Sequence, residues 1–449
     1  MRLRSNRLWA IIVCALSFFC CAGLPARGAP GSPWLVVSDI HYTPFDRDRS
    51  PSPYGEDTND ALLSSFLAEV RKVDPNPPVV VIAGDFLAHH FRLDAAASTM
   101  TALAKRFDAA FPHAQFVIAL GNNDSACGDY LAPVGGPFLA ATAKAWAPLV
   151  NRRGAAPDFA ARFARDGGYA ARLPLPGLRI VVANDVFESL RYGASCAQSQ
   201  NGAAQTLARF RSDLRAAGPR DRNWVLFHIP PGIDAFSTNL THHLAVVPFL
   251  RPNARESLDA AIGDAGDRVV LAIAGHTHKF AYRILSGAGR IPVPMLLVPS
   301  ISPIFYNGPS FLELTVANDG TVSRVVETSY FAGSWQVAGD LGKLGVRRFS
   351  ALELASLQAR LAHDSALRTA FSHLYSGGGP PEINEGNWRS YWCAAANFSA
   401  SAFKACTGQG GVSVFTSRAL KIALAGVCLL AAGGGAFFFF RRRGRPLRA

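Results

Sequence analysis

The chain has 449 residues, 49% of them hydrophobic, and a formal net charge of +13. Of its 45 lysines and arginines, 11 lie before residue 28 or after residue 417, where no acid occurs, so the body has 34 basic and 32 acidic residues. This near balance excludes the strongly basic surface of a nucleic-acid-binding domain, and we expect no nucleic acid partner.

The N-terminus has the composition of a secretory signal peptide. Residues 1–29 combine a basic start, an apolar run from Leu8 to Gly23 and small residues around Ala29, where a peptidase can cut. An uncleaved membrane anchor is the alternative, but the apolar run is short for a bilayer span. We therefore expect the body of the protein to be exported from the cytoplasm.

Five apolar runs predict buried strands, at 34–37, 79–83, 115–120, 224–227 and 271–274. Continuous apolar strands are typical of a sheet that is covered on both faces. Between these strands the sequence predicts helices at 57–73 (with Thr58 as N-cap), 94–110, 137–166 (two helices), 203–217 and 253–264. Further strands are predicted within 169–187 and at 280–284, 294–298, 311–316 and 321–327. Strands that alternate with helices predict an α/β core, and we assign residues 30–334 to one catalytic domain.

The composition changes towards the C-terminus. Residues 335–410 are predicted to form a helical subdomain, with a helix over 350–376. Residues 422–440 contain no charge and are long enough to span a bilayer, and the arginines of the tail at 441–449 place that tail on the cytoplasmic side. The catalytic domain would then be membrane-anchored on the periplasmic or extracellular side. A buried core helix and a sorting tail that is later cleaved are the alternatives.

Four cysteines lie between the signal peptide and the predicted span, namely Cys127, Cys196, Cys393 and Cys406. An even number in an exported body indicates disulfides, and four cysteines allow three connectivities. We favour the pairs Cys393–Cys406 and Cys127–Cys196.

Potential metal ligands follow each of the five apolar strands. They are Asp39, His41, Asp85, Asn122, His228, His276 and His278. In an extended chain, residues two apart point the same way, so His276 and His278 are expected to face one point. Asp85 can bridge two ions, with Asp39, His41 and His278 around one ion and the remaining three residues around the other. Mixed nitrogen and oxygen ligands favour zinc, manganese or iron over calcium or magnesium, and we expect zinc first. A pair of dications favours an anionic substrate such as a phosphate ester.

The order D-x-H, G-D, G-N, H and G-H-x-H resembles the calcineurin-like metallophosphoesterase superfamily. Five segments are similar to its acid sphingomyelinase branch, namely Asp39-Ile40-His41, Gly84-Asp85 with His89, His228 to Gly232, Gly275 to His278 and Pro299 to Pro303. This resemblance covers residues 33–410. It implies a β-sandwich of four layers flanked by helices, and a phosphodiesterase in which a metal-bridging hydroxide attacks phosphorus in line. His89 would protonate the leaving oxygen, or would only hydrogen-bond the phosphate.

One segment departs from the family pattern. Asn123 stands where the family usually has a histidine, so the third motif is G-N-N-D, which resembles endopolyphosphatase-like relatives. A neutral amide can hydrogen-bond a phosphoryl oxygen but cannot donate a proton as imidazolium does. The substrate is therefore expected to be a phosphate-ester small molecule or lipid, with polyphosphate or a nucleotide as the alternative. A non-catalytic metal-binding protein is a third hypothesis, and the sequence gives no indication of the oligomeric state.

Overall fold

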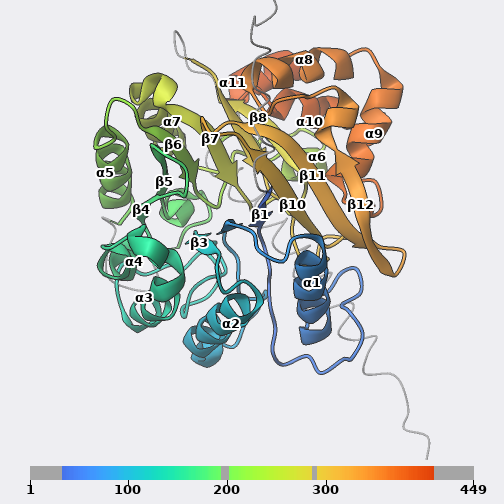
Figure 1. Cartoon of the computed structure of the whole chain (residues 1–449). Helices are drawn as coiled ribbons and strands as arrows, with labels where there is room; N and C mark the ends of the chain where they lie inside the picture. The colour runs from blue at the N-terminus through green and yellow to red at the C-terminus, as the bar shows by residue number, and fades with distance from the viewer. Residues whose placement is uncertain (1–32, 194–201, 286–290, 409–449) are drawn as a thin grey trace, which may run out of the picture.

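A computed structural model of the chain describes residues 33–193, 202–285 and 291–408. Their core consists of two six-stranded sheets (Figure 1). The first sheet has the order β12-β11-β10-β1-β2-β3 and the second the order β4-β5-β6-β7-β9-β8. Both contain parallel and antiparallel pairs, so the expected α/β fold with two sheets is confirmed.

The strands of the first sheet are β1 (Pro33–Val37), β2 (Val79–Ile82), β3 (Gln115–Ile118), β10 (Ser310–Val316), β11 (Val322–Phe331) and β12 (Ser334–Asp340). Those of the second are β4 (Tyr169–Arg172), β5 (Leu178–Val182), β6 (Arg222–Leu226), β7 (Val269–Ala274), β8 (Ala281–Leu285) and β9 (Val293–Leu297). Strands β1, β2 and β3 are parallel neighbours, as are β5, β6, β7 and β9. The carboxyl ends of parallel neighbours lie along one edge of a sheet, where ligands bind in folds of this class.

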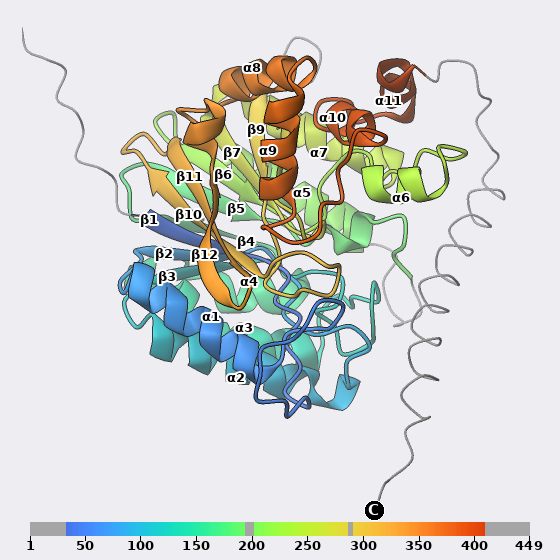
Figure 2. The same cartoon turned by 90° about the vertical axis from the view of Figure 1, so that its right-hand side faces the viewer.

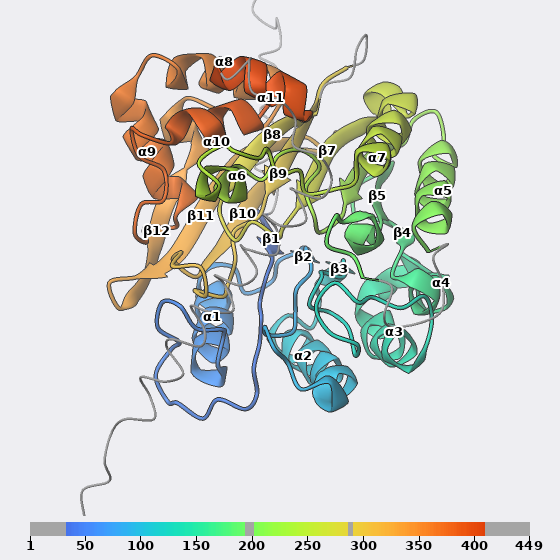
Figure 3. The same ribbon diagram turned by 180° about the vertical axis from the view of Figure 1, so that it is seen from behind.

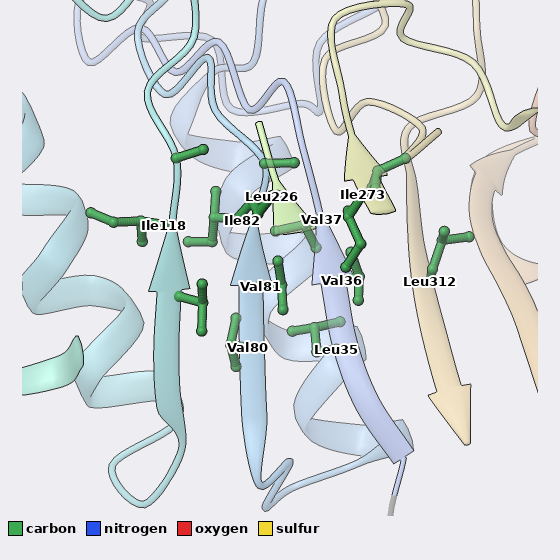
Figure 4. Packing of buried hydrophobic residues seen from close by; sticks show 14 of the residues in the cluster. Leu35, Val36, Val37, Val80, Val81, Ile82, Ile118, Leu226, Ile273 and Leu312 are labelled. Carbon is green, nitrogen blue, oxygen red and sulfur yellow. The ribbon is translucent and has the colours of Figure 1, made fainter. Parts of the chain in front are cut away.

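Helices cover the outer faces of the two sheets (Figures 1 and 3). They are α1 (Asp60–Val73), α2 (Ala96–Ala110), α3 (Pro137–Val150), α4 (Phe159–Asp166), α5 (Gly202–Arg215) and α7 (Pro252–Asp264), whereas α6 (Ala235–Leu240) packs against C-terminal helices. Helices α1 and α2 pack against the first sheet, and α5 and α7 against the second. The inner faces meet in one apolar core, where the rings of Trp34 and Trp224 lie 5.0 Å apart. Figure 4 shows Leu35, Val80 and Ile118 of the first sheet beside Leu226 and Ile273 of the second.

The C-terminal part differs in two ways from its prediction. Residues 334–340 form strand β12, so the predicted boundary at residue 335 falls inside the first sheet. The predicted helix over 350–376 is two helices, α8 (Ala351–Leu361) and α9 (Ser365–Tyr375), because Asp364 caps a new helix by accepting a hydrogen bond from the Leu367 amide. They are followed by α10 (Trp388–Ala394) and α11 (Ala400–Thr407). Helices α10 and α11 lie beside α6 (Figure 2).

One of the two predicted disulfides is confirmed. Cys393 and Cys406 are bonded and connect α10 to α11. Cys127 is also disulfide-bonded, but Cys196 lies outside the described residues, so its pairing with Cys127 stays a prediction.

The predicted signal peptide at 1–29 and the predicted span at 422–440, with the tail at 441–449, lie outside the described residues. Among the helices of residues 33–408 that the structure describes, none has the length and apolar character to cross a membrane.

Candidate metal centre

The seven predicted ligands converge at the carboxyl ends of β1, β2, β3, β6 and β7. The sequence interpretation assumed an extended backbone at His276 and His278, but the backbone there is not extended. Asp39, His41, Asp85, His276 and His278 all have positive φ, from 44° to 70°. Residues other than glycine seldom adopt this left-handed conformation, and its cost of about 1–3 kcal/mol each is typical of functional sites. The chain therefore turns sharply at the ends of β1, β2 and β7 and directs these five side chains inward.

His276 and His278 consequently belong to two neighbouring groups rather than facing a single point. The first group contains Asp39, His41 and His278. The Nε2 atoms of the two imidazoles lie 3.1 Å apart, and Asp39 Oδ1 lies 3.3 Å from His278 Nε2 and 3.8 Å from His41 Nε2. All three side chains are buried.

The second group contains Asp85, His228 and His276. Asn122 joins it, because its Oδ1 lies 3.2 Å from His228 Nε2. Asp85 connects the two groups, since its Oδ2 lies 3.3 Å from His228 Nε2 and 3.4 Å from His41 Nε2. A carboxylate between two sets of nitrogen donors has the position required of a ligand shared by two ions.

Backbone carbonyls orient the imidazoles of this centre. His228 Nδ1 donates to Ala83 O at 2.7 Å, and His41 Nδ1 donates to Leu87 O at 3.1 Å. Each bond uses Nδ1 as the donor and directs Nε2 at the carboxylates, the orientation found in metal-binding histidines. The Asn122 amide is fixed in a similar way, because its Nδ2 donates to Asp129 Oδ1 at 2.7 Å and turns Oδ1 towards His228.

Carboxylates concentrate negative charge at this edge of the sheets. Burial lowers the pKa of His41, but the hydrogen bond to Asp39 and the charges of Asp85 and Asp57 outweigh it and raise the pKa to about 9. Burial likewise lowers the pKa of His228, whereas Asp85 raises it, with a net value of about 10. A dication entering the site meets the same field and would displace these protons.

The donors fit a pair of divalent ions. Two ligands of a tetrahedral ion at about 2.1 Å lie about 3.4 Å apart. The spacings of 3.3–3.4 Å from Asp85 Oδ2 to the imidazoles, and of 3.3 Å from Asp39 Oδ1 to His278 Nε2, are close to that figure. Glycine makes room for the carboxylates, since a Cβ at Gly121 would overlap Asp85 Oδ1 and one at Gly275 would lie 2.8 Å from Asp39 Oδ2.

His89 lies at the border of the first group, and its ring stacks on that of His41 at 4.2 Å. The Asp57 carboxylate accepts two hydrogen bonds from His89, one from the backbone amide at 2.8 Å and one from Nδ1 at 3.0 Å. The sequence interpretation missed Asp57 because it placed this residue in a helix capped by Thr58. That helix begins at Asp60 and is capped by Asn59, whose side chain accepts from the Leu62 amide. The polar run from Glu56 to Asp60, longer than one cap requires, was the available signal.

Asn123 contacts the carboxylate that joins the two groups. Its backbone amide donates to Asp85 Oδ1 at 2.8 Å, and its side-chain Nδ2 donates to Oδ2 at 3.0 Å. Asp185, which the sequence interpretation also missed, accepts from the backbone amides of His228 and Ile229 at 3.1 Å. It fixes the loop that carries His228, and no sequence pattern marked it.

A cavity of about 2090 Å³ opens over the centre. Asp85, His89, Asn122, His276 and His278 are among the residues that line it. Residues of the C-terminal helices line it as well, among them Phe371, Tyr375, Tyr391 and Trp392. Five large hydrophobic side chains of its lining are exposed, namely Tyr54, Phe236, Leu240, Phe305 and Tyr306.

Comparison with known proteins agrees with this geometry. Residues 32–280 match the model of the family described as Calcineurin-like phosphoesterase. The chain belongs to this family. The matched segment contains all seven predicted ligands, and the family uses a binuclear metal centre, in agreement with the two groups of donors.

Two relatives are similar to most of the described residues. The chain is 25% identical over 296 residues to "Sphingomyelinase phosphodiesterase D" of Dictyostelium discoideum, covering 62% of this chain and 61% of that protein. It is 23% identical over 305 residues to "Acid sphingomyelinase-like phosphodiesterase 3b" of Homo sapiens, covering 62% and 64%. The aligned part thus spans about three-fifths of each relative. Among solved structures, PhoD aligns with a TM-score of 0.41 at 10% identity, covering 71% of this chain and 70% of that one.

Proposed function

We propose that this protein is a hydrolase of phosphate esters that depends on two divalent metal ions, and that its preferred substrates are phosphodiesters. One observation carries the proposal, the position of Asp85 Oδ2 at 3.3 Å and 3.4 Å from imidazoles of two separate donor groups at the end of a large cavity. Membership of the phosphoesterase family and the two similar phosphodiesterases support it.

The ligand residues would be Asp39, His41 and His278 for one ion and Asn122, His228 and His276 for the other, with Asp85 shared. When bound, such ions lower the pKa of a water molecule and neutralise charge on the phosphoryl group, and zinc suits these donors best, with manganese or iron as alternatives. The chain holds its donors in fixed directions through the carbonyl contacts of His41 and His228.

His89 has the position of a general acid. The Asp57 carboxylate accepts from its Nδ1, so Nε2 is the nitrogen that can donate a proton to the departing oxygen. General acid catalysis contributes about 10²–10⁴-fold, most for alcohols of high pKa. Asn123 cannot supply a proton, but its Nδ2 can hydrogen-bond either Asp85 or a phosphoryl oxygen that reaches the same place.

The size of the cavity favours a diester with a bulky organic group. A volume of about 2090 Å³ is well above the roughly 300–1,000 Å³ of an ordinary ligand pocket, and many aromatic side chains line it. A lipid or another large ester fits these dimensions. Hydrolysis of a phosphoanhydride, such as polyphosphate or a nucleotide, is the second candidate, because Arg191 lines the cavity and places a cation where a further phosphate could bind.

A substrate panel tests the proposal. The full chain, in detergent and loaded in turn with zinc and manganese, is offered bis-p-nitrophenyl phosphate, p-nitrophenyl phosphate, sphingomyelin, ATP and polyphosphate. Faster turnover of bis-p-nitrophenyl phosphate or sphingomyelin supports the phosphodiesterase. Preference for ATP or polyphosphate assigns the anhydride reaction instead, and a chain that binds no metal at all contradicts both.

We also propose that the protein is exported and anchored by its C-terminal segment, with the catalytic domain on the non-cytoplasmic side. The composition of residues 1–29 and 422–440 supports this placement. Mass spectrometry of the mature N-terminus and protease protection of sealed membrane vesicles test it. A retained N-terminal methionine and a catalytic domain in the soluble cytoplasmic fraction would contradict it.

A further inference from the structure

Lys279 is a buried cation in the lining of the cavity, directly after the candidate ligand His278. The residue is 3% exposed. Its Nζ donates to Phe305 O at 3.1 Å and lies 3.3 Å from Glu382 Oε2. A lysine is seldom buried to this extent unless its charge is paired. The carboxylate that pairs with it, that of Glu382, lies 103 residues later in the chain (382 − 279 = 103), in the C-terminal part.

Glu382 is itself held in place by two tyrosines. Its Oε1 accepts hydrogen bonds from Tyr375 Oη at 3.1 Å and from Tyr391 Oη at 2.8 Å. Both tyrosines line the cavity, and they flank Glu382 in sequence, one at the end of α9 and one in α10. The carboxylate therefore has a fixed position relative to the C-terminal helices.

The other partner of Lys279 carries a ring that contacts the centre. The centroid of the Phe305 ring lies 4.5 Å from that of His278 and 5.7 Å from that of His89, with the rings steeply inclined to each other in both pairs. Yet Phe305 is 48% exposed, so packing alone does not fix the ring. Its carbonyl accepts a hydrogen bond from Lys279, and this contact connects the loop that carries Phe305 to Lys279.

From this continuous chain of contacts we infer that Lys279 and Glu382 are positioning residues, through which the C-terminal helices hold Phe305 against His89 and His278. The inference rests on the proposed hydrolase function. It explains why the C-terminal segment lines the same cavity as the metal ligands. Loss of the Glu382 charge leaves Lys279 with only a neutral partner, and the loop around Phe305 then loosens.

Two variants and one control test this inference in the full chain. Glu382→Gln removes the charge but keeps the shape, and Phe305→Ala removes the ring at a partly exposed site. Glu385→Gln is the control, because Glu385 lies in the same loop and pairs with Arg368 at 3.1 Å but is exposed and does not line the cavity. Hydrogen exchange of residues 300–310 is measured without metal, and kcat and KM are measured with zinc.

Glu382→Gln is expected to speed exchange over residues 300–310. With two ions still bound, Glu382→Gln and Phe305→Ala should each lower kcat about 10- to 100-fold, because a catalytic group misplaced by about 1 Å costs a factor of this order. KM should change by less than about threefold. The control should match the wild type in both measurements.

Unchanged kcat in Phe305→Ala, or Glu382→Gln indistinguishable from Glu385→Gln, would overturn the inference. If Glu382→Gln fails to fold, the kcat of Phe305→Ala tests the inference by itself. An inactive wild type would refute the proposed function instead. The hydrogen exchange of residues 300–310 would then still test whether Glu382 orders the loop around Phe305.

Discussion

Asp57 offers a precise test of the acid assigned to the site. It accepts two hydrogen bonds from His89, at 2.8 Å from the backbone amide and at 3.0 Å from Nδ1. Burial raises the pKa of this carboxyl, but the bonds from His89 outweigh burial and lower it, so the group is ionised. Each carboxylate oxygen of Asp57 accepts one of these bonds. Asparagine has one side-chain oxygen, so its NH₂ group would face one of the two donors of His89 and that hydrogen bond would be lost. A hydrogen bond to a charged group contributes about 1.5–3 kcal/mol.

If that energy holds the His89 ring in its productive orientation, its loss corresponds to about 10- to 100-fold in rate. We therefore expect Asp57→Asn to lower kcat by this factor for diesters with alkyl leaving groups, which need a proton. For p-nitrophenyl diesters, whose leaving group needs none, the change should stay within about threefold. Asp94→Asn is the matched control, because Asp94 forms an exposed ion pair with Arg92 and does not line the cavity. Equal losses for both classes of diester, or no loss for either, would refute the reasoning.

Three further predictions concern the centre and the fold. Gly121→Ala places a Cβ on Asp85 Oδ1, so metal content measured by plasma mass spectrometry should fall below one ion per chain, whereas Gly218→Ala, whose Cβ meets Asp221 no closer than 3.4 Å, should retain two. Chelation should lower the melting temperature, and zinc should restore it, because ions that bind only the folded chain stabilise it; equal melting temperatures would contradict this. Burial raises the pKa of Glu327 to about 8. The folded chain thus holds a proton that the unfolded chain releases near pH 4.5, so the free energy of unfolding in urea should fall as the pH rises from 5 to 8. The fall should be smaller in Glu327→Gln. Equal slopes of unfolding free energy against pH in the variant and the wild type would contradict this.

The strands and the meeting of the candidate ligands at one edge were predictable because both have local causes in the sequence. Apolar runs such as Val79 to Ala83 can be buried only in a covered sheet, and polar residues that follow several such runs must meet at one edge. Division of the seven candidate ligands into two groups joined by Asp85 was expected from their residue types, and the geometry brings them together in those groups.

The errors have equally specific causes. Reasoning from extended backbone failed at His276 and His278, because both residues have left-handed φ and the His276 amide donates to Asp39, which follows a distant strand. Asp57 was assigned to a helix because propensity does not reveal which acid a distant histidine will recruit. Glu382 had no local signal at all, since its partners Lys279, Tyr375 and Tyr391 meet only once the C-terminal helices pack against the second sheet.

Asp85 is proposed to join two metal ions. Crystals of the zinc-loaded protein, measured at wavelengths on either side of the zinc absorption edge, test this role directly. We predict two anomalous peaks about 3.5–4 Å apart, each about 2.0–2.2 Å from an oxygen of Asp85, with His278 beside one and His228 beside the other. A single peak, or two peaks of which only one contacts Asp85, would contradict it.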